Sequence, residues 1–254
     1  MSAKTRQVPG GRWCALVLTL ALSGPVRAGE ILVAGAVSLR EPLTEIARGY
    51  EREHAGTRVQ LTFGASNFLA AQLRAGAPID IFVSADARIV DALVAEGLVA
   101  PTAIRMLARN RLVVLARPGL ASVPTTVGEL DAPGIRRIAI PDGAVPVGRY
   151  AREWLERSGL LARLTPRLIP TEHARSTLAA VDAGNADVAV VYATDARLAR
   201  HAKLAFRVPA AEQPDILYAV ARARRARAEA NAFPAWLDGP VAQQALANAG
   251  FEAP

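Results

Sequence analysis

Short apolar runs and amphipathic segments alternate along almost the whole chain. Apolar runs of strand length occur at 31–34, 59–62, 79–83, 112–116, 138–140, 187–191 and 216–220. Between them apolar residues recur at helical spacing, as in 43–53 and 150–157. Such alternation is typical of α/β proteins in which parallel sheets are covered by helices on both faces.

Two of the apolar runs bracket a central block of about the size of a domain. One is 111–117, which ends before a Pro-Gly pair, and the other is 215–221, which follows Pro214. We therefore expect two lobes joined by these hinge strands, although one continuous sheet is also compatible with the pattern. The first lobe would comprise 29–111 and 221–254, and the second 112–220. Helical segments at 226–237 and 241–249 would pack on the first lobe.

The amino-terminal segment 1–28 has the composition of a secretory signal. Basic residues precede an apolar core at 13–22, and Val26-Arg27-Ala28 resembles a cleavage site. The core is shorter than the roughly 20 residues of a membrane span. The only cysteine, Cys14, lies inside this segment, so the mature chain would have no disulfide. We therefore expect a periplasmic protein.

The basic charge of the chain has little bearing on its partners. Removal of 1–28, which carries four basic residues and no acidic ones, lowers the formal net charge from +7 to +3. The remaining cluster at 222–227 could suggest a nucleic acid, but a solvated helix start explains it as well. For an exported protein we favour the second interpretation and expect no nucleic-acid partner.

Candidate polar groups gather where strands give way to helices. Ser38 and Ser66 each follow an apolar strand and open a helical segment, as N-caps or near-caps. The run 141–148 opens another helix and 172–175 a further one, while Tyr192 ends the run 188–192. Helix starts carry free N–H groups and a partial positive charge. Several of them converging on one point could hold a compact anion without a basic side chain.

Taken in order, these segments resemble the periplasmic molybdate-binding proteins of bacterial ABC transporters over nearly the whole mature chain. The matching stretches include the run Ala75-Gly-Ala-Pro-Ile-Asp-Ile-Phe-Val-Ser-Ala-Asp86, together with 36–39, 63–66, 145–148, 172–175 and 190–196. The resemblance implies a two-lobed periplasmic-binding-protein fold of type II that closes on a tetrahedral oxyanion. It also implies a monomer that delivers molybdate, together with tungstate, to a membrane permease and needs no cofactor.

The resemblance also implies which groups hold the ion. Ser38 and Ser66 would each provide a hydroxyl and a backbone N–H, Val147 and Ala174 a backbone N–H each, and Tyr192 its phenolic O–H. The family often has alanine at the position of Val147 and valine at that of Ala174, which changes the volume of the pocket rather than its hydrogen bonds. The metal would be held only as its oxyanion, without direct metal ligands.

A site of donors alone suits an ion that is fully deprotonated near neutral pH, such as molybdate, tungstate or sulfate. Monohydrogen phosphate carries a proton that requires an acceptor, and a buried unpaired group costs about 1–3 kcal/mol. The nearest carboxylate in sequence is Asp195, and we interpret Thr194-Asp195 as the cap of the following helix. A receptor for another tetrahedral oxyanion, such as sulfate, is therefore the main alternative.

Other classes of protein are less compatible with the sequence. The chain has no G-x-S-x-G, Walker A or G-x-G-x-x-G motif. A serine hydrolase would have to combine Ser66 with His173, which we expect to be a solvent-facing residue at a helix start. A receptor for a metal cation would need paired tyrosines or clustered His, Cys and carboxylates, which the spacing does not offer. A cytoplasmic sensor is incompatible with a signal peptide. We therefore expect a binding protein and no catalytic residues.

Overall fold

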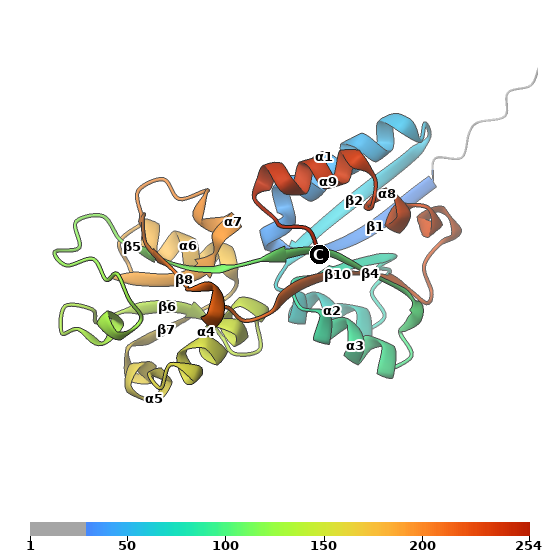
Figure 1. Ribbon diagram of the computed structural model, residues 1–254. Helices are drawn as coiled ribbons and strands as arrows, with labels where there is room; N and C mark the ends of the chain where they lie inside the picture. Colours follow the sequence, from blue (N-terminus) through green and yellow to red (C-terminus); the bar gives the residue numbers. More distant parts are fainter. Residues whose placement is uncertain (1–28) are drawn as a thin grey trace, which may run out of the picture.

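The computed structural model describes residues 29–254, and the signal peptide expected at 1–28 lies outside the described residues. Two lobes lie side by side, each built on one β-sheet, and two stretches of chain run between them (Figure 1). The two-lobed α/β fold expected from the sequence is confirmed. In the described part of the chain, no helix combines the length and apolar character that a membrane crossing requires.

The first lobe contains a five-stranded sheet. Its strands, in spatial order, are β2 (Thr57–Gly64), β1 (Gly29–Ala36), β3 (Ile81–Ser84), β10 (Ile216–Ala223) and β4 (Val99–Asn110). Apolar residues of α1 (Arg40–Glu53) and α9 (Pro240–Ala249) pack on one face of this sheet, and those of α2 (Ser66–Arg74) and α3 (Ala87–Ala95) pack on the other (Figure 1). Both faces of β3 are therefore buried, and all its residues are apolar except Ser84.

The second lobe repeats this plan. Its sheet has the order β7 (Leu168–Thr171), β6 (Ile138–Pro141), β8 (Val188–Tyr192), β5 (Leu112–Ala116) and β9 (Lys203–Arg207). One face packs against α4 (Pro146–Arg157), and the other against α6 (Ala174–Asp182). The short helices α5 (Leu161–Leu164) and α7 (Ala193–Ala196) complete the lobe. The central strand β8 is wholly buried, as is β3 in the first lobe.

The sheets are mixed, which corrects the expectation of parallel sheets. In the first lobe β1 runs parallel to β2 and β3, whereas β10 is antiparallel to β3 and β4. In the second lobe β6 is parallel to β7 and β8, whereas β5 is antiparallel to β8 and β9. The antiparallel strands β5 and β10 each follow a crossing from the other lobe. They therefore enter their sheets from the side where the lobes meet.

The crossings also locate the boundaries between the lobes. The chain leaves the first sheet after Asn110 and enters the second at Leu112. It returns before Ile216, because the whole of β10 belongs to the first sheet. Residues 216–220, assigned to the second lobe from sequence, therefore lie in the first.

The carboxyl-terminal region differs from the expected pair of helices. The expected helix at 241–249 is present as α9, but 226–237 forms only a 3₁₀ turn, η5 (Ala228–Asn231), and the short helix α8 (Phe233–Trp236). Pro234 interrupts the segment because it cannot donate a helical hydrogen bond. Other 3₁₀ turns are η1 (Val37–Leu39), η2 (Gly128–Asp131), η3 (Thr165–Arg167) and η4 (Ala210–Glu212).

Candidate functional site

Residues from both lobes line one small cavity. Ser38, in η1, and Ser66, the first residue of α2, come from the first lobe. Val147 and Ala174, from the first turns of α4 and α6, come from the second, as does Tyr192 at the end of β8. All the residues that the sequence analysis selected are therefore brought together, and the lobes are closed on them.

The cavity is the size of a small ion. The space open to the centre of a water-sized sphere is about 20 Å³, whereas a single water needs roughly 10–15 Å³ by the same measure. Its lining consists of small and apolar residues, the two serines, Tyr192 and His173. Among residues 29–254, no carboxylate, lysine or arginine lines it. Such a cavity suits a compact ligand that is recognised by hydrogen bonds.

Three helices begin at the lining of this cavity. In α2, α4 and α6 the carbonyl oxygen of the N-cap residue accepts the first helical hydrogen bond. The donors are the N–H groups of Leu69, Arg149 and Thr177. The N–H groups of Ser66, Val147 and Ala174 precede them and have no partner inside their helices. Each helix start also favours negative charge. The site thus concentrates donors and positive potential without a basic side chain.

The start of α4 requires a glycine. A Cβ atom at Gly148 would lie 2.2 Å from the carbonyl oxygen of Asp142 and 2.5 Å from that of Pro141. Because these atoms are backbone, no side-chain rotation could relieve the clash. Gly148 therefore lets the first turn of α4, with Val147, approach the end of β6 closely.

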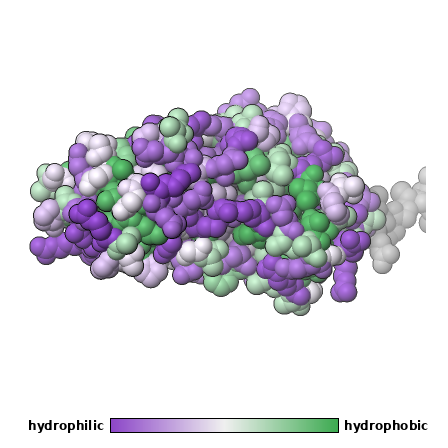
Figure 2. All heavy atoms as spheres, turned by 60° about the horizontal axis from the view of Figure 1, so that its bottom comes forward, coloured by the Kyte–Doolittle hydropathy of each residue, from purple (hydrophilic) through white to green (hydrophobic). Residues whose placement is uncertain are grey.

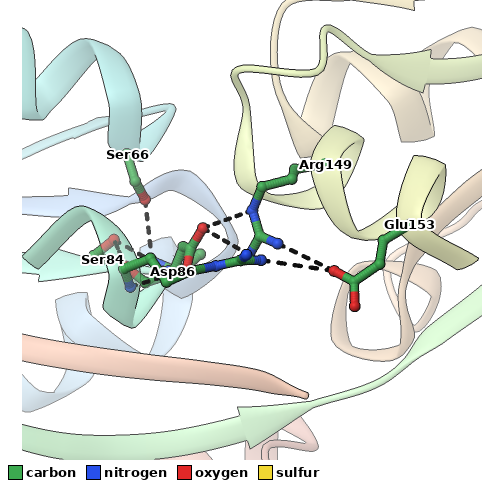
Figure 3. Close-up of polar contacts among 7 residues, drawn as sticks. Ser66, Ser84, Asp86, Arg149 and Glu153 are labelled. Atoms are coloured by element: carbon green, nitrogen blue, oxygen red, sulfur yellow. Dashed lines mark hydrogen bonds and ion pairs between the residues drawn. The ribbon is translucent and has the colours of Figure 1, made fainter. Parts of the chain in front are cut away.

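Neither serine is an N-cap, but both lie near one, which corrects one of the two expected interpretations and agrees with the other: Ser66 directly follows the N-cap of α2, and Ser38 directly precedes that of α1. The N-caps of η1 and α2 are Ala36 and Ala65, and neither helix has a side-chain cap. The Ser66 hydroxyl instead accepts a hydrogen bond from the Ala85 N–H at 3.0 Å (Figure 3). Because the Ser66 oxygen is the acceptor in this bond, the hydroxyl proton remains available to donate to a ligand in the cavity.

The Tyr192 hydroxyl is buried and has no hydrogen-bond partner in the described part of the chain. The side chain is 1% exposed, and burial raises the pKa of its hydroxyl well above the ordinary value. The group is therefore protonated and can donate. An unpaired buried hydroxyl costs about 1–3 kcal/mol, which a ligand that accepts its proton would recover.

An ion pair joins the two lobes beside the site. Asp86, the N-cap of α3, contacts Arg149 of α4, with Nε–Oδ2 at 2.9 Å and Nη2–Oδ2 at 2.7 Å (Figure 3). Arg149 also reaches Glu153 at 3.2 Å on its own helix. Asp86 is 4% exposed, whereas Glu153 is partly open to solvent.

On the face shown in Figure 2, hydrophilic side chains extend over the middle of the molecule.

Asp195 does not cap the helix that contains it, which corrects a second sequence interpretation. The N-cap of α7 is Tyr192, and the Asp195 carboxylate is fully buried against Arg175, with Nε–Oδ1 at 2.7 Å. Arg175 also pairs with Glu41 of the first lobe. Burial raises the pKa of Asp195 to about 6, although Arg175 opposes the shift. The carboxylate lies outside the cavity lining.

His173 is a helix-start residue, as expected, but it is half-buried rather than facing solvent. Its Nδ1 accepts a hydrogen bond from the Ser176 N–H at 3.1 Å and so caps α6. No hydrogen bond joins His173 to Ser66 among residues 29–254, and His173 Nδ1 already accepts from the Ser176 N–H. A serine–histidine catalytic pair is therefore not assembled here.

Sequence reasoning missed the groups that support the site from behind. Arg149, Asn110 and Tyr218 were not selected, and Asp86 and Arg175 were noted only as parts of matching stretches. The buried Asp86–Arg149 pair joins residues 63 positions apart, and no local periodicity reports such a contact. Asn110 offered one signal, because it is a polar residue at the end of a strand. No group of three or more His, Cys, Asp or Glu in the described range could hold a metal ion.

Comparisons with known proteins agree with this geometry. A family model described as bacterial extracellular solute-binding protein matches residues 31–252. The molybdate-binding protein ModA of Escherichia coli (strain K12) is 32% identical over 242 residues, covering 92% of this chain and 94% of that protein. ModA of Haemophilus influenzae is 30% identical over 229 residues, covering 88% and 90%.

Solved structures show the same arrangement. The periplasmic molybdate-binding protein of Azotobacter vinelandii matches with a TM-score of 0.78 at 26% identity, covering 88% of this chain and 99% of that one. The sulfate-binding protein SubI from Mycobacterium tuberculosis H37Rv matches with a TM-score of 0.75 at 16% identity, covering 88% and 86%. The second likeness shows the fold alone, so the fold does not choose between the two ions.

Proposed function

The chain belongs to the bacterial extracellular solute-binding proteins, and from this premise we propose that it captures molybdate in the periplasm and delivers it to the membrane permease of an ABC transporter. Its similarity to molybdate-binding proteins over nine-tenths of its length supports the choice of ion. It is a transport binding protein and not an enzyme. The signal-like segment 1–28 supports export, and tungstate, which has the same shape and charge, is included in the proposal.

The observation that carries the proposal is the unpaired Tyr192 hydroxyl in a cavity lined by donors and by no carboxylate. Ser38, Ser66 and Tyr192 would give O–H groups to the ion, and Ser38, Ser66, Val147 and Ala174 would give backbone N–H groups. Molybdate only accepts hydrogen bonds near neutral pH, so every group of the site matches it. Closure of two lobes on the ion is the change that a permease could recognise.

The same lining disfavours a ligand that carries a proton. Asp195, the carboxylate nearest in sequence, lies outside the lining and is paired with Arg175. Monohydrogen phosphate would find no acceptor for its proton and would leave buried groups unpaired, at about 1–3 kcal/mol. Sulfate fits the same donors and differs in size, so it remains the second candidate. We propose that the protein works as a monomer without a cofactor or a nucleic-acid partner.

Titration calorimetry on the anion-stripped mature protein, with molybdate, tungstate, sulfate and phosphate in turn, tests this function. Tight one-to-one binding of molybdate and tungstate, weak binding of sulfate and none of phosphate are expected. Tight sulfate binding would make the protein a receptor for the smaller oxyanion. Absence of heat with all four would refute the oxyanion site.

Replacement of Tyr192 by Phe tests the donor that carries the proposal. A hydrogen bond to a charged group contributes about 1.5–3 kcal/mol, so molybdate affinity should fall roughly 10- to 150-fold. The ligand-free protein should melt at the same temperature or higher, because the lost hydroxyl is unpaired there. Unchanged affinity would remove Tyr192 from the site.

A further inference from the structure

A buried chain of polar groups lies behind Ser38. The Ser38 hydroxyl is 2.9 Å from the Tyr218 hydroxyl. The Tyr218 oxygen is 3.3 Å from Asn110 Nδ2, which also donates to Thr194 Oγ1 at 2.9 Å. These side chains are at most 5% exposed. Tyr218 and Asn110 do not line the cavity. The Tyr218 hydroxyl is linked to it by the hydrogen bond to Ser38, while the Tyr218 ring packs near that of Tyr192, with centroids 5.9 Å apart.

The direction of the hydrogen bonds follows from the amide at one end. The Arg111 N–H donates to Asn110 Oδ1 at 2.9 Å, which identifies the other amide atom as the nitrogen. That nitrogen only donates, so the Tyr218 oxygen is the acceptor. The Tyr218 proton then has one recorded acceptor among the described residues, the Ser38 oxygen. Leaving it unpaired would cost about 1–3 kcal/mol.

The Ser66 hydroxyl is also an acceptor from within the protein, but its donor is a backbone group. Its oxygen accepts from the Ala85 backbone N–H, which cannot reverse its direction. The Ser38 oxygen accepts from a hydroxyl, which could donate or accept. Only Ser38 therefore needs a further residue to determine whether its hydroxyl donates or accepts in the hydrogen bond to Tyr218.

We propose that Asn110 and Tyr218 are positioning residues that hold Ser38 as a hydrogen-bond donor toward the bound anion. The chain runs from Asn110 to Tyr218 to Ser38, and each group donates to the next and leaves the Ser38 proton for the ligand. This role rests on the proposed oxyanion function. It adds that discrimination in favour of fully deprotonated ions depends on residues that the ion does not touch.

The chain also lies where the lobes are joined. Asn110 ends β4 just before the first crossing, Tyr218 lies in β10 just after the second, and Thr194 belongs to α7 of the second lobe. The donor state of Ser38 is thus set by residues of the hinge region. The amide of Asn110 bonds both Tyr218 of the first lobe and Thr194 of the second.

A double-mutant cycle tests the direction of the chain. In Asn110→Asp, measured at pH 8, the carboxylate accepts from Tyr218, so Ser38 must donate backward and turns a lone pair toward the ion. We expect molybdate affinity to fall roughly 100-fold. In Tyr218→Phe, Ser38 loses one partner but can still donate, and we expect a loss of roughly 3- to 10-fold, the range of a neutral hydrogen bond.

The decisive quantity is the coupling between the two changes. When Tyr218→Phe is already present, Asn110→Asp cannot reverse the hydrogen bond of Ser38, because its partner hydroxyl is gone. Only the repulsion between the new carboxylate and the anion remains. Its effect should then be at least tenfold smaller than in the wild-type background. Additive effects would overturn the proposal, because simple repulsion or loss of structure does not depend on the Tyr218 hydroxyl.

Two controls separate this outcome from failure to fold and from failure of the proposed function. Tyr50→Phe removes the hydroxyl of a tyrosine that is also 2% exposed or less but packs against Phe233 and Trp236, outside the cavity lining. It should leave molybdate affinity unchanged. If Asn110→Asp does not fold, equal affinities of Tyr218→Phe and Tyr50→Phe refute the chain. A wild-type titration without heat refutes the oxyanion function itself.

Discussion

The central strand of each lobe carries an aspartate near both ends, and the two ends differ in chemistry. Asp80 and Asp86 flank β3 in the first lobe, and Asp187 and Asp195 flank β8 in the second. Within residues 29–254 these are the only buried acidic side chains, each 5% exposed or less. Similar burial therefore allows their surroundings to be compared directly.

The aspartates at the amino ends are satisfied within their own lobes. Asp80 accepts from the Leu32 and Arg227 N–H groups and from the Arg227 guanidinium. Burial alone would raise the pKa of Asp80, but these hydrogen bonds outweigh it and hold the pKa below its ordinary value. Asp187 repeats the arrangement with two consecutive backbone N–H groups, at 136–137, and Arg117, and its pKa is lowered in the same way.

The aspartates at the carboxyl ends depend on arginines at the junction of the lobes. Asp86 accepts one backbone N–H and pairs with Arg149 of the opposite lobe. Asp195 pairs with Arg175, which also contacts Glu41 of the opposite lobe. Burial raises the pKa of both carboxylates despite the arginines.

The comparison teaches that position along a strand, rather than residue type or burial, separates the framework from the site. The amino-end pairs do not involve the other lobe, so opening of the cleft leaves them intact. At the carboxyl ends, the Asp86–Arg149 pair and the Arg175–Glu41 contact cross between the lobes, so we expect opening of the cleft to break them. We therefore expect mutations at the amino ends to alter stability without affecting binding, and mutations at the carboxyl ends to alter either molybdate binding or the pH dependence of stability.

Asp80→Ala should have the largest effect. It leaves the Leu32 and Arg227 N–H groups and a guanidinium without their acceptor, so the free energy of unfolding should fall by about 3 kcal/mol. For a chain of this size the melting temperature would drop about 6–12 °C. Thermal unfolding and calorimetry check this, with molybdate affinity of the folded fraction unchanged. Asp215→Ala, at an exposed surface pair, should change stability by less than about 0.5 kcal/mol.

Asp195 should impose a pH dependence of stability. Its pKa is 3.8 in the unfolded chain and about 6 in the fold, so the folded state holds the proton more tightly. This contribution is fully present below about pH 4 and is lost as the pH rises through about 6. As the pH rises from about 4 to about 6, the free energy of unfolding of Asp195→Asn should therefore increase by roughly 2 kcal/mol relative to that of the wild type.

Urea unfolding of both proteins across this window measures the difference. The charges that face Asp195 are those of Arg175 and Glu41. A constant difference at all pH values would show that Asp195 is ionised throughout, like Asp80, and would remove the contrast between the strand ends.

Much of the fold was predictable because buried strands are apolar and the neighbouring residues in the sequence mark where each one begins and ends. The run 112–116 coincides with β5, and the run 187–191 is offset by a single residue from β8. The strands β7 and β9 were missed because they are short edge strands, the first containing Pro170 and the second polar at both ends. β4 was missed because Pro101 and two arginines, Arg105 and Arg109, break its apolar pattern.

The candidate site was predictable only in part. Resemblance to a family selected Ser38, Ser66 and Tyr192, and the structure brings them to one cavity. The pairs across the lobes could not be predicted, because they depend on how two separate sheets approach each other. The cap interpretation of Asp195 failed for a related reason, since sequence does not show that Arg175 lies beside it.

Arg149→Met tests the carboxyl end of β3. It removes the ion pair between the closed lobes and leaves Asp86 with only the more distant Arg88 of its own helix, at 3.7 Å. Molybdate affinity should therefore fall roughly tenfold, or about 1.4 kcal/mol. Arg74→Met is a matched control, because Arg74 pairs with Glu96 on the surface of one lobe. Equal titration curves for Arg149→Met and the wild type would show that the pair does not contribute to closure.

Glu153→Gln should have the smallest effect and locates the contribution of Arg149 more sharply. Glu153 contacts Arg149 on the same helix, at i and i+4, and its side chain is 40% exposed. Such pairs contribute about 0.3–0.5 kcal/mol and are screened by salt. Molybdate affinity should therefore fall less than about threefold at low salt and be unchanged at high salt. Glu153 also reaches Arg88 of the first lobe at 3.6 Å. A loss as large as that of Arg149→Met would therefore mean that exposed Glu153, through Arg149 or Arg88, contributes to closure as much as buried Asp86 does, and it would contradict the contrast between the strand ends.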